Sequence, residues 1–526
     1  MIGATYSAEN YMEYQKTGNK NLFEEVIDMM MLDGFALEFQ EKIMFMPTKE
    51  KRMAILSLLD KDRKLFTKIK SLINDLVLPA TSATKIDHIK DVILMLREYV
   101  KVGEVEKKKF GEVMTPLELV KEMLDTLPKE VWSNPNLKWL DPANGTGPYP
   151  TMVIYKLMKG LEDWEPCQEK RYKHIVENMI YVAELQPKNM FLYMCIVDPW
   201  DVYDMNIYCG SFLDGGFDRH MKEVWGIDRV DIVIGNPPYQ EMDGGAKASA
   251  KPIYNLFTEK SIKLSDKVVF ITPSRWFGGG KGLDSYRKMM MESNKIKTIN
   301  HYDDASKIFG NSVEIKGGVS YFLYDNLYKG NCSFNNNEVT LSDFDVVVSK
   351  TESLNLISKL LKYNNISSIC HPRSYFGIDI SDKRITNEKI SDKYAKCYVS
   401  KLKGFEKWIN TEGIKKDSIH FRVVTPRAAT KGGEGFGNLF LLNPGEYITD
   451  SYISFFTNSE SEAMSLLSYL KTNFANYLLG IRKVSQTVKG DTCKWIPMVP
   501  FDREWTDEKL FEHFKLTEEE KKLILK

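Results

Sequence analysis

The stretch Ile232-Val-Ile-Gly-Asn-Pro-Pro-Tyr-Gln240 sets the expectations for the whole chain. The β-branched run from Val230 to Ile234 is typical of a buried strand. Two prolines follow, and because proline has no N–H to donate to a sheet, the strand must end there. The sequence therefore predicts a strand whose carboxyl end presents the amide of Asn236, two rigid carbonyls and the ring of Tyr239. In open α/β sheets, ligands bind at that edge.

The groups of this turn suit a planar, amide-like nitrogen. The side-chain oxygen of Asn236 and the carbonyl of Pro237 both accept hydrogen bonds, so together they can hold the two hydrogens of an exocyclic amine. These two hydrogen bonds would draw the nitrogen lone pair out of conjugation and direct it at an electrophile. Tyr239 can stack on the ring that carries the amine. The element from Asn236 to Tyr239 resembles the catalytic motif of S-adenosylmethionine-dependent amino-methyltransferases, although a plain proline turn would explain the same residues.

Composition and length bound the class of protein. The 526 residues predict about three domains, and 43% hydrophobic with 27% charged residues is ordinary for a globular protein. No apolar run reaches the ~18 residues of a membrane span, and the N-terminus lacks a signal-peptide pattern. The seven cysteines contain no Cys-x-x-Cys pair, which predicts neither zinc nor disulfides. We therefore expect a cytoplasmic protein with no membrane segment and no metal.

The first part of the chain has a helical pattern. Between residues 1 and 108, apolar residues recur at helical spacing, as at Ile86, Ile89 and Ile93. No catalytic pattern is found there. We expect a helical N-terminal domain over 1–108.

Thr115-Pro116-Leu-Glu118 predicts the start of a helix. Threonine is a good N-cap, proline suits the first helical position, and Glu118 would complete a capping box. Helix N-termini also bind carboxylates. A capping box alone would account for these residues without any ligand.

Two strands are expected to end at ligand-binding residues. One ends at Asp141, and the glycines of Asp141-Pro-Ala-Asn-Gly-Thr-Gly147 allow the backbone to approach a ligand closely before a helix begins near Thr151. The run from Met179 to Glu184 predicts the second strand. In Rossmann-like sheets, an acid at that edge accepts hydrogen bonds from ribose hydroxyls. A glutamate on a solvated edge is the plain alternative.

Three later features follow the same order. A strand near 206–209 leads to Phe212, whose ring can stack on an adenine. Phe309 precedes the run 313–324, which predicts a hairpin or paired strands at the sheet edge. Asp303 with Glu314-Ile-Lys316 mimics the metal trio of a nuclease, but the same residues fit the strand pattern better.

In this order the motifs resemble γ-order N6-adenine DNA methyltransferases of type II restriction–modification systems. The resemblance covers residues 110–325 well and 400–500 more loosely. It implies an α/β fold with a Rossmann-like methyltransferase core at 109–330, and transfer of a methyl group to the N6 amine of a flipped adenine in double-stranded DNA. The catalytic residues would be Asn236, Pro237, Pro238 and Tyr239, with Tyr239 and Phe309 sandwiching the adenine. S-adenosylmethionine would be held by Thr115, Pro116, Asp141, Pro142, Ala143, Gly145, Gly147, Glu184, Phe212 and Asn236.

Residues 331–526 resemble the mixed α/β target-recognition domains of the same enzymes. Formal net charge is zero, with 72 basic and 72 acidic residues, but Lys and Arg gather in 396–432. Such a run suits DNA, although a solvated surface explains it equally well. The expected partners are double-stranded DNA and a cognate restriction endonuclease; the oligomeric state is not predicted. The predicted DNA contacts are Arg422, Arg427, Lys431, Arg482 and Lys483.

Other functions stay open at this point. N4-cytosine methyltransferases use similar chemistry, although they usually carry Ser or Asp in place of Asn236. The chain also fits the methylase half of a combined restriction–modification enzyme. Protein-glutamine methyltransferases share the Asn-Pro-Pro-Tyr motif but are short and lack a long domain after it. A non-enzymatic specificity subunit would not need an intact Asn236 and glycine turn.

Overall fold

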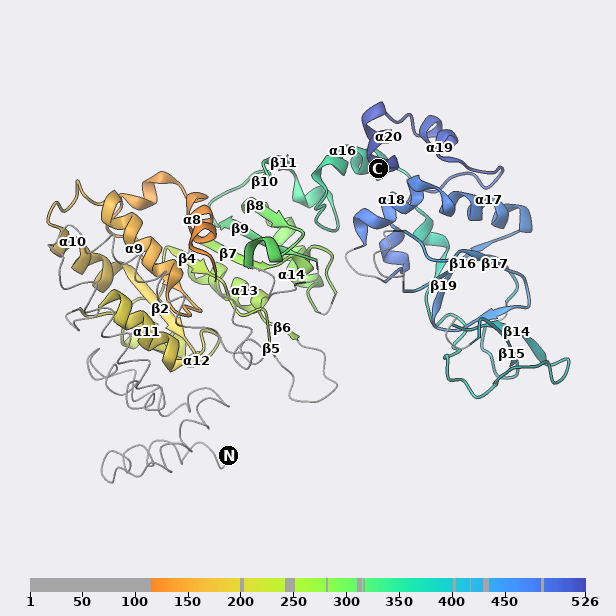
Figure 1. Cartoon of the computed structure of the whole chain (residues 1–526), viewed down its shortest axis with the longest axis horizontal. Coiled ribbons are helices and arrows are strands. Elements are labelled where there is room, and N and C mark those ends of the chain that lie inside the picture. The colour runs from red at the N-terminus through yellow and green to blue at the C-terminus, as the bar shows by residue number, and fades with distance from the viewer. Residues whose placement is uncertain are drawn as a thin grey trace, which may run out of the picture. The chain divides into compact units, whose positions relative to one another are not determined.

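The computed structural model describes residues 115–198, 203–241, 251–280, 282–309, 315, 317–400, 404–416, 418–428, 435–483 and 487–526. The predicted helical domain at 1–108 and the predicted DNA contact Lys431 lie outside these residues. The chain divides into two compact units (Figure 1). Unit 1 takes the described residues up to Trp276 and Gly280–Asp343, and unit 2 takes Phe277–Gly279 and Phe344–Lys526.

Unit 1 is built on a sheet with, among its described residues, nine strands in the order β11-β10-β8-β9-β7-β4-β1-β2-β3. Strands β3, β2, β1, β4 and β7 run parallel. The bounds are β1 (Trp139–Asp141), β2 (Ile180–Glu184), β3 (Asn206–Cys209), β4 (Ile232–Gly235), β7 (Lys267–Pro273), β8 (Ile296–Tyr302), β9 (Val319–Asp325), β10 (Cys332–Phe334) and β11 (Asn337–Val339).

One strand lies elsewhere than predicted. The segment expected at the sheet edge supplies β9, which instead runs antiparallel between β7 and β8. Every residue of β9 is buried. A strand buried on both faces is stabilised in the middle of a sheet, where both its edges are also paired.

Helices cover both faces of this sheet. One hydrophobic core joins α8 (Leu117–Asp125), α9 (Pro148–Gly160) and α11 (Pro187–Val197) to strand residues such as Val182 and Ile207. Neighbouring strand residues point to the opposite face, where Tyr208 meets Phe217 of α12 (Gly215–Glu223) edge to face. The α/β fold class is therefore confirmed. The other elements of unit 1 are α10 (Gln168–His174), α13 (Tyr254–Leu264), α14 (Asp284–Glu292), α15 (Ser306–Phe309), β5 (Gln240–Glu241) and β6 (Lys251–Pro252).

The strand order places a topological switch point between β1 and β4. From β1 the chain adds β2 and then β3 on one side, and it returns to the other side of β1 to form β4. The connections that follow β1 and β4 therefore leave the sheet in opposite directions. In doubly wound sheets, ligands bind outside the carboxyl ends of the strands at this point.

Unit 2 has a different architecture, with two sheets that each have four strands among the described residues, in the orders β12-β19-β16-β17 and β13-β15-β14-β18. One core packs helices on the first sheet, and a second core contains residues of both sheets. The strands are β12 (Cys370–His371), β13 (Ile385–Thr386), β14 (Tyr394–Tyr398), β15 (Glu406–Asn410), β16 (Phe421–Pro426), β17 (Phe440–Leu442), β18 (Tyr447–Ile448) and β19 (Tyr452–Thr457). The helices are α16 (Leu354–Leu360), α17 (Glu460–Lys471), α18 (Asn473–Arg482), α19 (Asp507–His513) and α20 (Glu518–Leu525).

The division between the units differs from the predicted boundary after residue 330. The segment 331–343, which the sequence assigned to the second domain, belongs to unit 1. The physical reason is that β10 pairs with β8 and β11 pairs with β10, so this segment extends the first sheet. None of the helices in the described part of the chain is long and apolar enough to cross a membrane.

Candidate active site

Three predicted site residues lie where parallel strands end. Asp141 is the last residue of β1, Glu184 is the last of β2, and Asn236 directly follows β4. Since the carboxyl ends of neighbouring parallel strands meet at one edge, the sheet brings these side chains together. Asp141 and Glu184 are both buried.

Asp141 links the ends of β1 and β4. Its Oδ1 accepts a hydrogen bond from the backbone N–H of Ala143 at 3.0 Å, which shapes the turn after β1. The same oxygen lies against Gly235, where an added Cβ would be 2.8 Å away. Burial raises the pKa of Asp141 well above its usual value; the Ala143 N–H opposes that shift, and the charge of Glu184 adds to it.

The glycine turn is tied to β2 through Glu184. Gly145 donates its N–H to Glu184 Oε2 at 2.7 Å, and Gln186 donates to Oε1 at 2.8 Å. Gly145 and Gly147 have φ angles of 54° and 86°, in the left-handed region that favours glycine. A side chain at Gly147 would also overlap the ring of Tyr193.

The helix after this turn begins earlier than predicted. Its predicted start was near Thr151, but α9 begins at Pro148, with Gly147 as the N-cap residue. Proline is well tolerated at the first helical position because its missing N–H would have no partner within the helix there. The Pro148-Tyr-Pro150 sequence is therefore compatible with the helix start.

Thr115 does not act as the predicted N-cap. The N-cap residue of α8 is Pro116, and no side chain caps that helix. The Thr115 hydroxyl instead accepts a hydrogen bond from Asn236 Nδ2 at 3.1 Å. A tertiary contact to the β4 turn thus replaces the local cap, and it joins two of the predicted site segments directly.

The aromatic residues predicted to hold a base are half-buried. Burial raises the pKa of the Tyr239 phenol, and its interaction with Asn236 opposes the shift. Phe309 ends α15 and packs against the unit 1 core beside Ile308 and Tyr302. A sandwich of one base between Tyr239 and Phe309 stays a prediction.

The ring of Phe212 lies deeper than its predicted role requires. It is 1% exposed, with Phe217 and Phe257 against it and Lys260 Nζ 5.0 Å from its centroid. Stacking on a cofactor adenine would require part of this ring to be uncovered. The half-exposed Asp214, two residues further on, is a polar group that was not predicted from the sequence, although an acid just after the third strand is a signal for it.

The residues at this edge fit S-adenosylmethionine. Asp141 Oδ2 is buried and has no hydrogen-bond partner among the described residues. A Cβ built on Gly145 would meet nothing within 4 Å, so the turn has room beside it. Glu184 is a buried carboxylate at the end of β2, the type of group that accepts hydrogen bonds from ribose hydroxyls.

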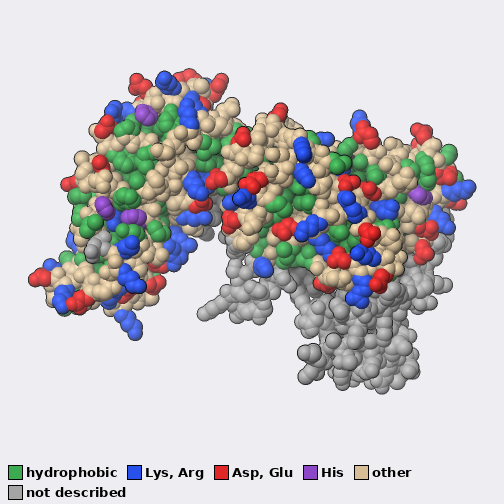
Figure 2. Space-filling model, turned by 180° about the vertical axis from the view of Figure 1, so that it is seen from behind, with side chains coloured by type: hydrophobic (Ala, Val, Ile, Leu, Met, Phe, Trp, Pro, Cys, Tyr) green, Lys and Arg blue, Asp and Glu red, His purple; other side chains and the backbone are tan. Residues whose placement is uncertain are grey.

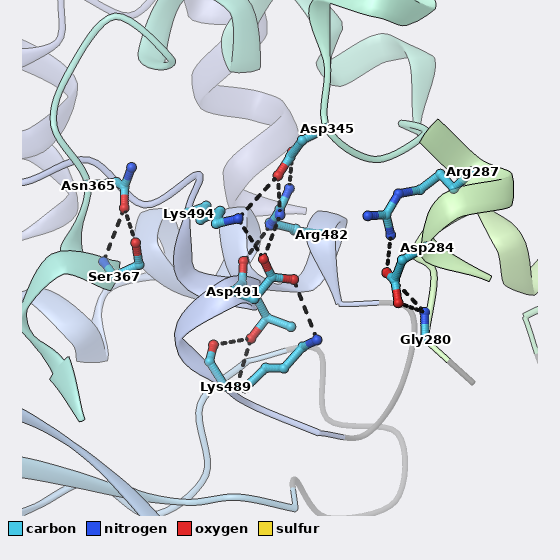
Figure 3. A network of polar contacts seen from close by, with 11 residues as sticks. Gly280, Asp284, Arg287, Asp345, Asn365, Ser367, Arg482, Lys489, Asp491 and Lys494 are labelled. Carbon is cyan, nitrogen blue, oxygen red and sulfur yellow. Dashed lines mark hydrogen bonds and ion pairs between the residues drawn. The ribbon is translucent and has the colours of Figure 1, made fainter. Parts of the chain in front are cut away.

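Two predicted DNA contacts are interior residues. Arg422 of β16 is fully buried, and Arg482 at the end of α18 is 3% exposed. The Arg482 guanidinium pairs with both carboxylate oxygens of Asp345, and it donates to the Asp491 carbonyl at 2.7 Å (Figure 3). Neither side chain can reach a phosphate as it lies, and both assignments are corrected for that reason. The number of basic residues in a segment does not reveal which of them are buried.

Two other predicted contacts lie on neighbouring segments. Ala428 and Thr487 form an isolated antiparallel bridge, and Val488 donates its N–H to the Arg427 carbonyl at 2.7 Å. Lys483 reaches across to the Gly435 carbonyl at 3.2 Å. The half-buried side chains of Arg427 and Lys483 are therefore carried by segments that the fold holds side by side. Their contact with DNA stays a prediction.

Comparison with known proteins agrees with this arrangement. Residues 213–309 match the family described as Eco57I restriction-modification methylase. That segment contains β4, the Asn236 turn and β7, and it ends at Phe309. An uncharacterized adenine-specific methylase of Mycoplasma pneumoniae is 28% identical over 293 residues, which cover 43% of this chain and 69% of that protein.

Solved structures show more distant likenesses. DrdV in complex with DNA is 11% identical with a TM-score of 0.44, over 80% of this chain and 58% of that one. The type IIL enzyme MmeI in complex with DNA is 10% identical with a TM-score of 0.41, over 75% and 68%. The M protein of the type I restriction enzyme EcoKI is 15% identical with a TM-score of 0.32, over 45% and 48%. The chain spans about half the length of that subunit and of similar ones. These likenesses are too distant to assign a function.

The described residues thus have an α/β fold, and the segment that follows β3 is similar to restriction-modification methylases.

Proposed function

We propose that the chain is a site-specific DNA methyltransferase that transfers a methyl group from S-adenosylmethionine to the N6 amine of adenine. The observation that carries this proposal is the hydrogen bond from Asn236 Nδ2 to Thr115 Oγ1. It joins the amide that would hold the target amine to the segment that precedes α8. The buried Asp141 and the glycine turn lie at the neighbouring strand end.

Asn236 and Pro237 are the proposed catalytic residues. Because the Nδ2 of Asn236 donates to Thr115, the orientation of the amide is fixed, with its oxygen on the other side. That oxygen and the Pro237 carbonyl would accept the two hydrogens of the adenine amine. The amine would then become pyramidal and more nucleophilic. Proximity and alignment supply most of the rate in such a site, and Tyr239 with Phe309 would fix the plane of the base.

The proposed cofactor contacts lie along the carboxyl ends of β1, β2 and β3. Glu184 would accept hydrogen bonds from the ribose, and the Gly145 turn would let the backbone approach the cofactor closely. Asp214, at the start of α12, is added here as an acceptor for the amine of the cofactor adenine. When bound, the cofactor supplies an electrophilic methyl group on a positively charged sulfur.

Double-stranded DNA is the proposed partner, and modification alongside a restriction endonuclease is the proposed role. The amine of a paired adenine lies inside the helix, so the base must leave the stack to reach Asn236. Unit 2 is the proposed target-recognition unit. Arg427 and Lys483 remain proposed contacts, and phosphates are their expected partners because such side chains position DNA more often than they read it.

The test is transfer of labelled methyl from S-adenosylmethionine to unmethylated genomic DNA, followed by nucleoside analysis. We expect N6-methyladenine, and sequencing of the modified sites would give the recognition sequence. An Asn236→Ala variant should bind the cofactor in calorimetry but methylate nothing. Label in N4-methylcytosine would overturn the choice of base. Label in protein, with none in DNA, would favour a protein-glutamine methyltransferase and overturn the proposal.

A further inference from the structure

Four aromatic side chains of unit 2 form a continuous column, which we call the ring column: Tyr375, His371, Phe456 and His420. The His371 and Tyr375 rings are parallel within 5° at a centroid distance of 3.8 Å. His371 lies 4.7 Å from Phe456 on its other side, and Phe456 lies 5.5 Å from His420. All four side chains are half-buried, so the column borders the surface.

Cations flank one end of this column. Lys416 Nζ lies 5.4 Å from the centroid of Tyr375, and Arg422 Cζ lies 5.2 Å from it. Lys416 is exposed, whereas Arg422 is buried beneath the rings. Cations over aromatic faces are favourable, so these contacts hold positive charge beside the column.

Beneath the rings, the polar groups lack acidic partners among the described residues. No carboxylate of the described residues contacts the guanidinium of Arg422; burial lowers the pKa of Arg422, and its interaction with the Tyr375 hydroxyl opposes that shift. Ser454 Oγ and His371 Nδ1 have no hydrogen-bond partner among the described residues. The strand register pairs Arg422 with Phe456 and His371 with Ser454. These two pairs therefore lie on one face of the sheet. A buried charge with no carboxylate beside it is costly, so an anion close to this face would be stabilised.

The local field is positive. Burial, followed by the charges of Arg422, His420 and Lys416, lowers the pKa of His371 to about 4. The imidazole is therefore neutral near neutral pH, although it is surrounded by cations. Figure 2 shows histidine side chains beside Lys and Arg on one face of the part that contains unit 2.

The covered ring faces decide which ligand suits this place. His371 stacks on both Tyr375 and Phe456, and Lys416 and Arg422 approach the Tyr375 ring. The column therefore offers its ring edges, which carry positive partial charge, rather than open faces on which a base could stack. Ring edges beside an exposed lysine suit a phosphate.

We propose that the surface formed by Lys416, His420 and the edge of the ring column binds a phosphate of the DNA backbone, with Arg422 as a fixed positive charge behind it. The choice of DNA as the source of the phosphate rests on the proposed function. The contact would anchor unit 2 on the duplex without reading sequence, because phosphates carry no base information.

The test compares Lys416→Ala with Lys415→Ala, a matched control at the neighbouring exposed lysine. Binding of a labelled DNA duplex is measured by anisotropy over a series of salt concentrations. Lys416→Ala should weaken binding of cognate and unrelated duplexes alike, and should reduce the slope of log K against log salt by about 0.9. Lys415→Ala should leave that slope closer to wild type. Equal effects of the two variants, or no effect of Lys416→Ala, would overturn the proposal.

Two further measurements separate the remaining possibilities. Arg422→Met, which keeps side-chain volume, should weaken DNA binding while thermal unfolding stays cooperative; a folded variant with wild-type affinity would refute the role of Arg422. Inorganic phosphate at fixed ionic strength should not displace DNA at millimolar concentration, and displacement that Lys416→Ala abolishes would show a site for free phosphate instead. Failure of the wild-type chain to bind DNA would refute the proposed function, whereas normal DNA binding with an inert Lys416 would refute only this inference.

Discussion

Asn236 and Thr115 are 121 residues apart in the chain and are joined by a hydrogen bond of 3.1 Å between Nδ2 and Oγ1. Both side chains lie where the sheet presents its carboxyl ends, and the bond sets which way the Asn236 amide faces. The hydroxyl of Thr115 is therefore expected to matter for the rate, although the sequence pattern suggested only a helix cap.

Thr115→Val should lower kcat for methyl transfer roughly tenfold, which corresponds to about 1.4 kcal/mol. Valine has the shape of threonine but cannot accept the hydrogen bond, so the amide would lose its fixed orientation. Thr115→Ser should keep most of the activity. Because no side chain caps α8, the valine variant should lose no helix cap, and its loss of unfolding free energy should be limited to that of one hydrogen bond, about 1 kcal/mol. A lower melting temperature together with unchanged kcat would show that Thr115 is a structural residue.

Gly235→Ala should destabilise the edge that carries the site. Its φ is 154°, and an added Cβ would come within 2.8 Å of Asp141 Oδ1. We expect a loss of about 1–3 kcal/mol in the free energy of unfolding, and weaker binding of S-adenosylmethionine because the Asp141 carboxyl would be displaced. Gly215→Ala is the matched control, since a Cβ there meets nothing within 4 Å. Equal stability of the two variants in urea titrations would contradict this account.

The parts of the site that could be predicted from sequence are those in which local pattern and function coincide. Asp141, Glu184 and Asn236 each follow a short apolar run, so their places at strand ends were readable from the chain alone. The hydrogen bond between Thr115 and Asn236 could not be predicted from sequence, because it joins two segments that are 121 residues apart in the chain. The spacing of apolar residues also does not indicate that β9 lies between β7 and β8.

Burial of charge is the other property that the sequence did not reveal. Arg422 lies in a β-branched strand, a context typical of the interior, yet its charge suggested a surface contact. Arg482 ends a helix whose inward face is apolar, and it is buried because Asp345 pairs with it. A buried basic residue is costly unless a partner from elsewhere in the chain or from a ligand stabilises it, and a single sequence does not show which residues form such pairs.

His301→Ala should loosen the end of the sheet near Phe309. His301 Nδ1 lies 2.8 Å from Ser274 Oγ, and its Nε2 lies 2.8 Å from Asp303 Oδ1. Ser274 is buried, so its hydroxyl would lose a partner in the variant, at a cost of about 1–3 kcal/mol in unfolding free energy. Asp303→Ala should cost much less, because that carboxylate is 92% exposed. Chemical denaturation measures the unfolding free energy of both variants.

The same pair of variants also tests positioning of the target base. The hydrogen bonds that link Ser274, His301 and Asp303 would hold the segment that leads to Phe309. If they do, His301→Ala should raise KM for DNA and leave the affinity for S-adenosylmethionine unchanged. A fluorescent adenine analogue at the methylated position would report how far the base leaves the stack. Wild-type KM and wild-type fluorescence in a destabilised variant would limit His301 to a structural role.

Asp345 and Arg482 predict how stability depends on pH. Burial raises the pKa of the Asp345 carboxyl, but hydrogen bonds and charge from Arg482 outweigh it, so the pKa is lowered overall. A carboxyl whose pKa is lower in the folded state than in the unfolded state stabilises the fold. This stability is fully present above the unfolded pKa of about 3.9. It is lost as pH falls through the lower folded-state pKa. Asp345→Asn should lower the free energy of unfolding by roughly 1–3 kcal/mol at pH 7. This is less than for a fully buried ion pair, because solvent screens the half-exposed Asp345.

The difference between wild type and Asp345→Asn should therefore shrink as pH is lowered below about 4. Denaturant titrations at a series of pH values measure it, and a difference that stays constant down to pH 2 would show that the ion pair contributes nothing through its charge. Asp502→Asn, at an exposed carboxylate paired only with its neighbour Arg503 among the described residues, is the control and should have little effect at any pH. Neither change should alter the salt dependence of DNA binding, because Arg482 is buried and also donates to the Asp491 carbonyl, so it does not contact phosphate.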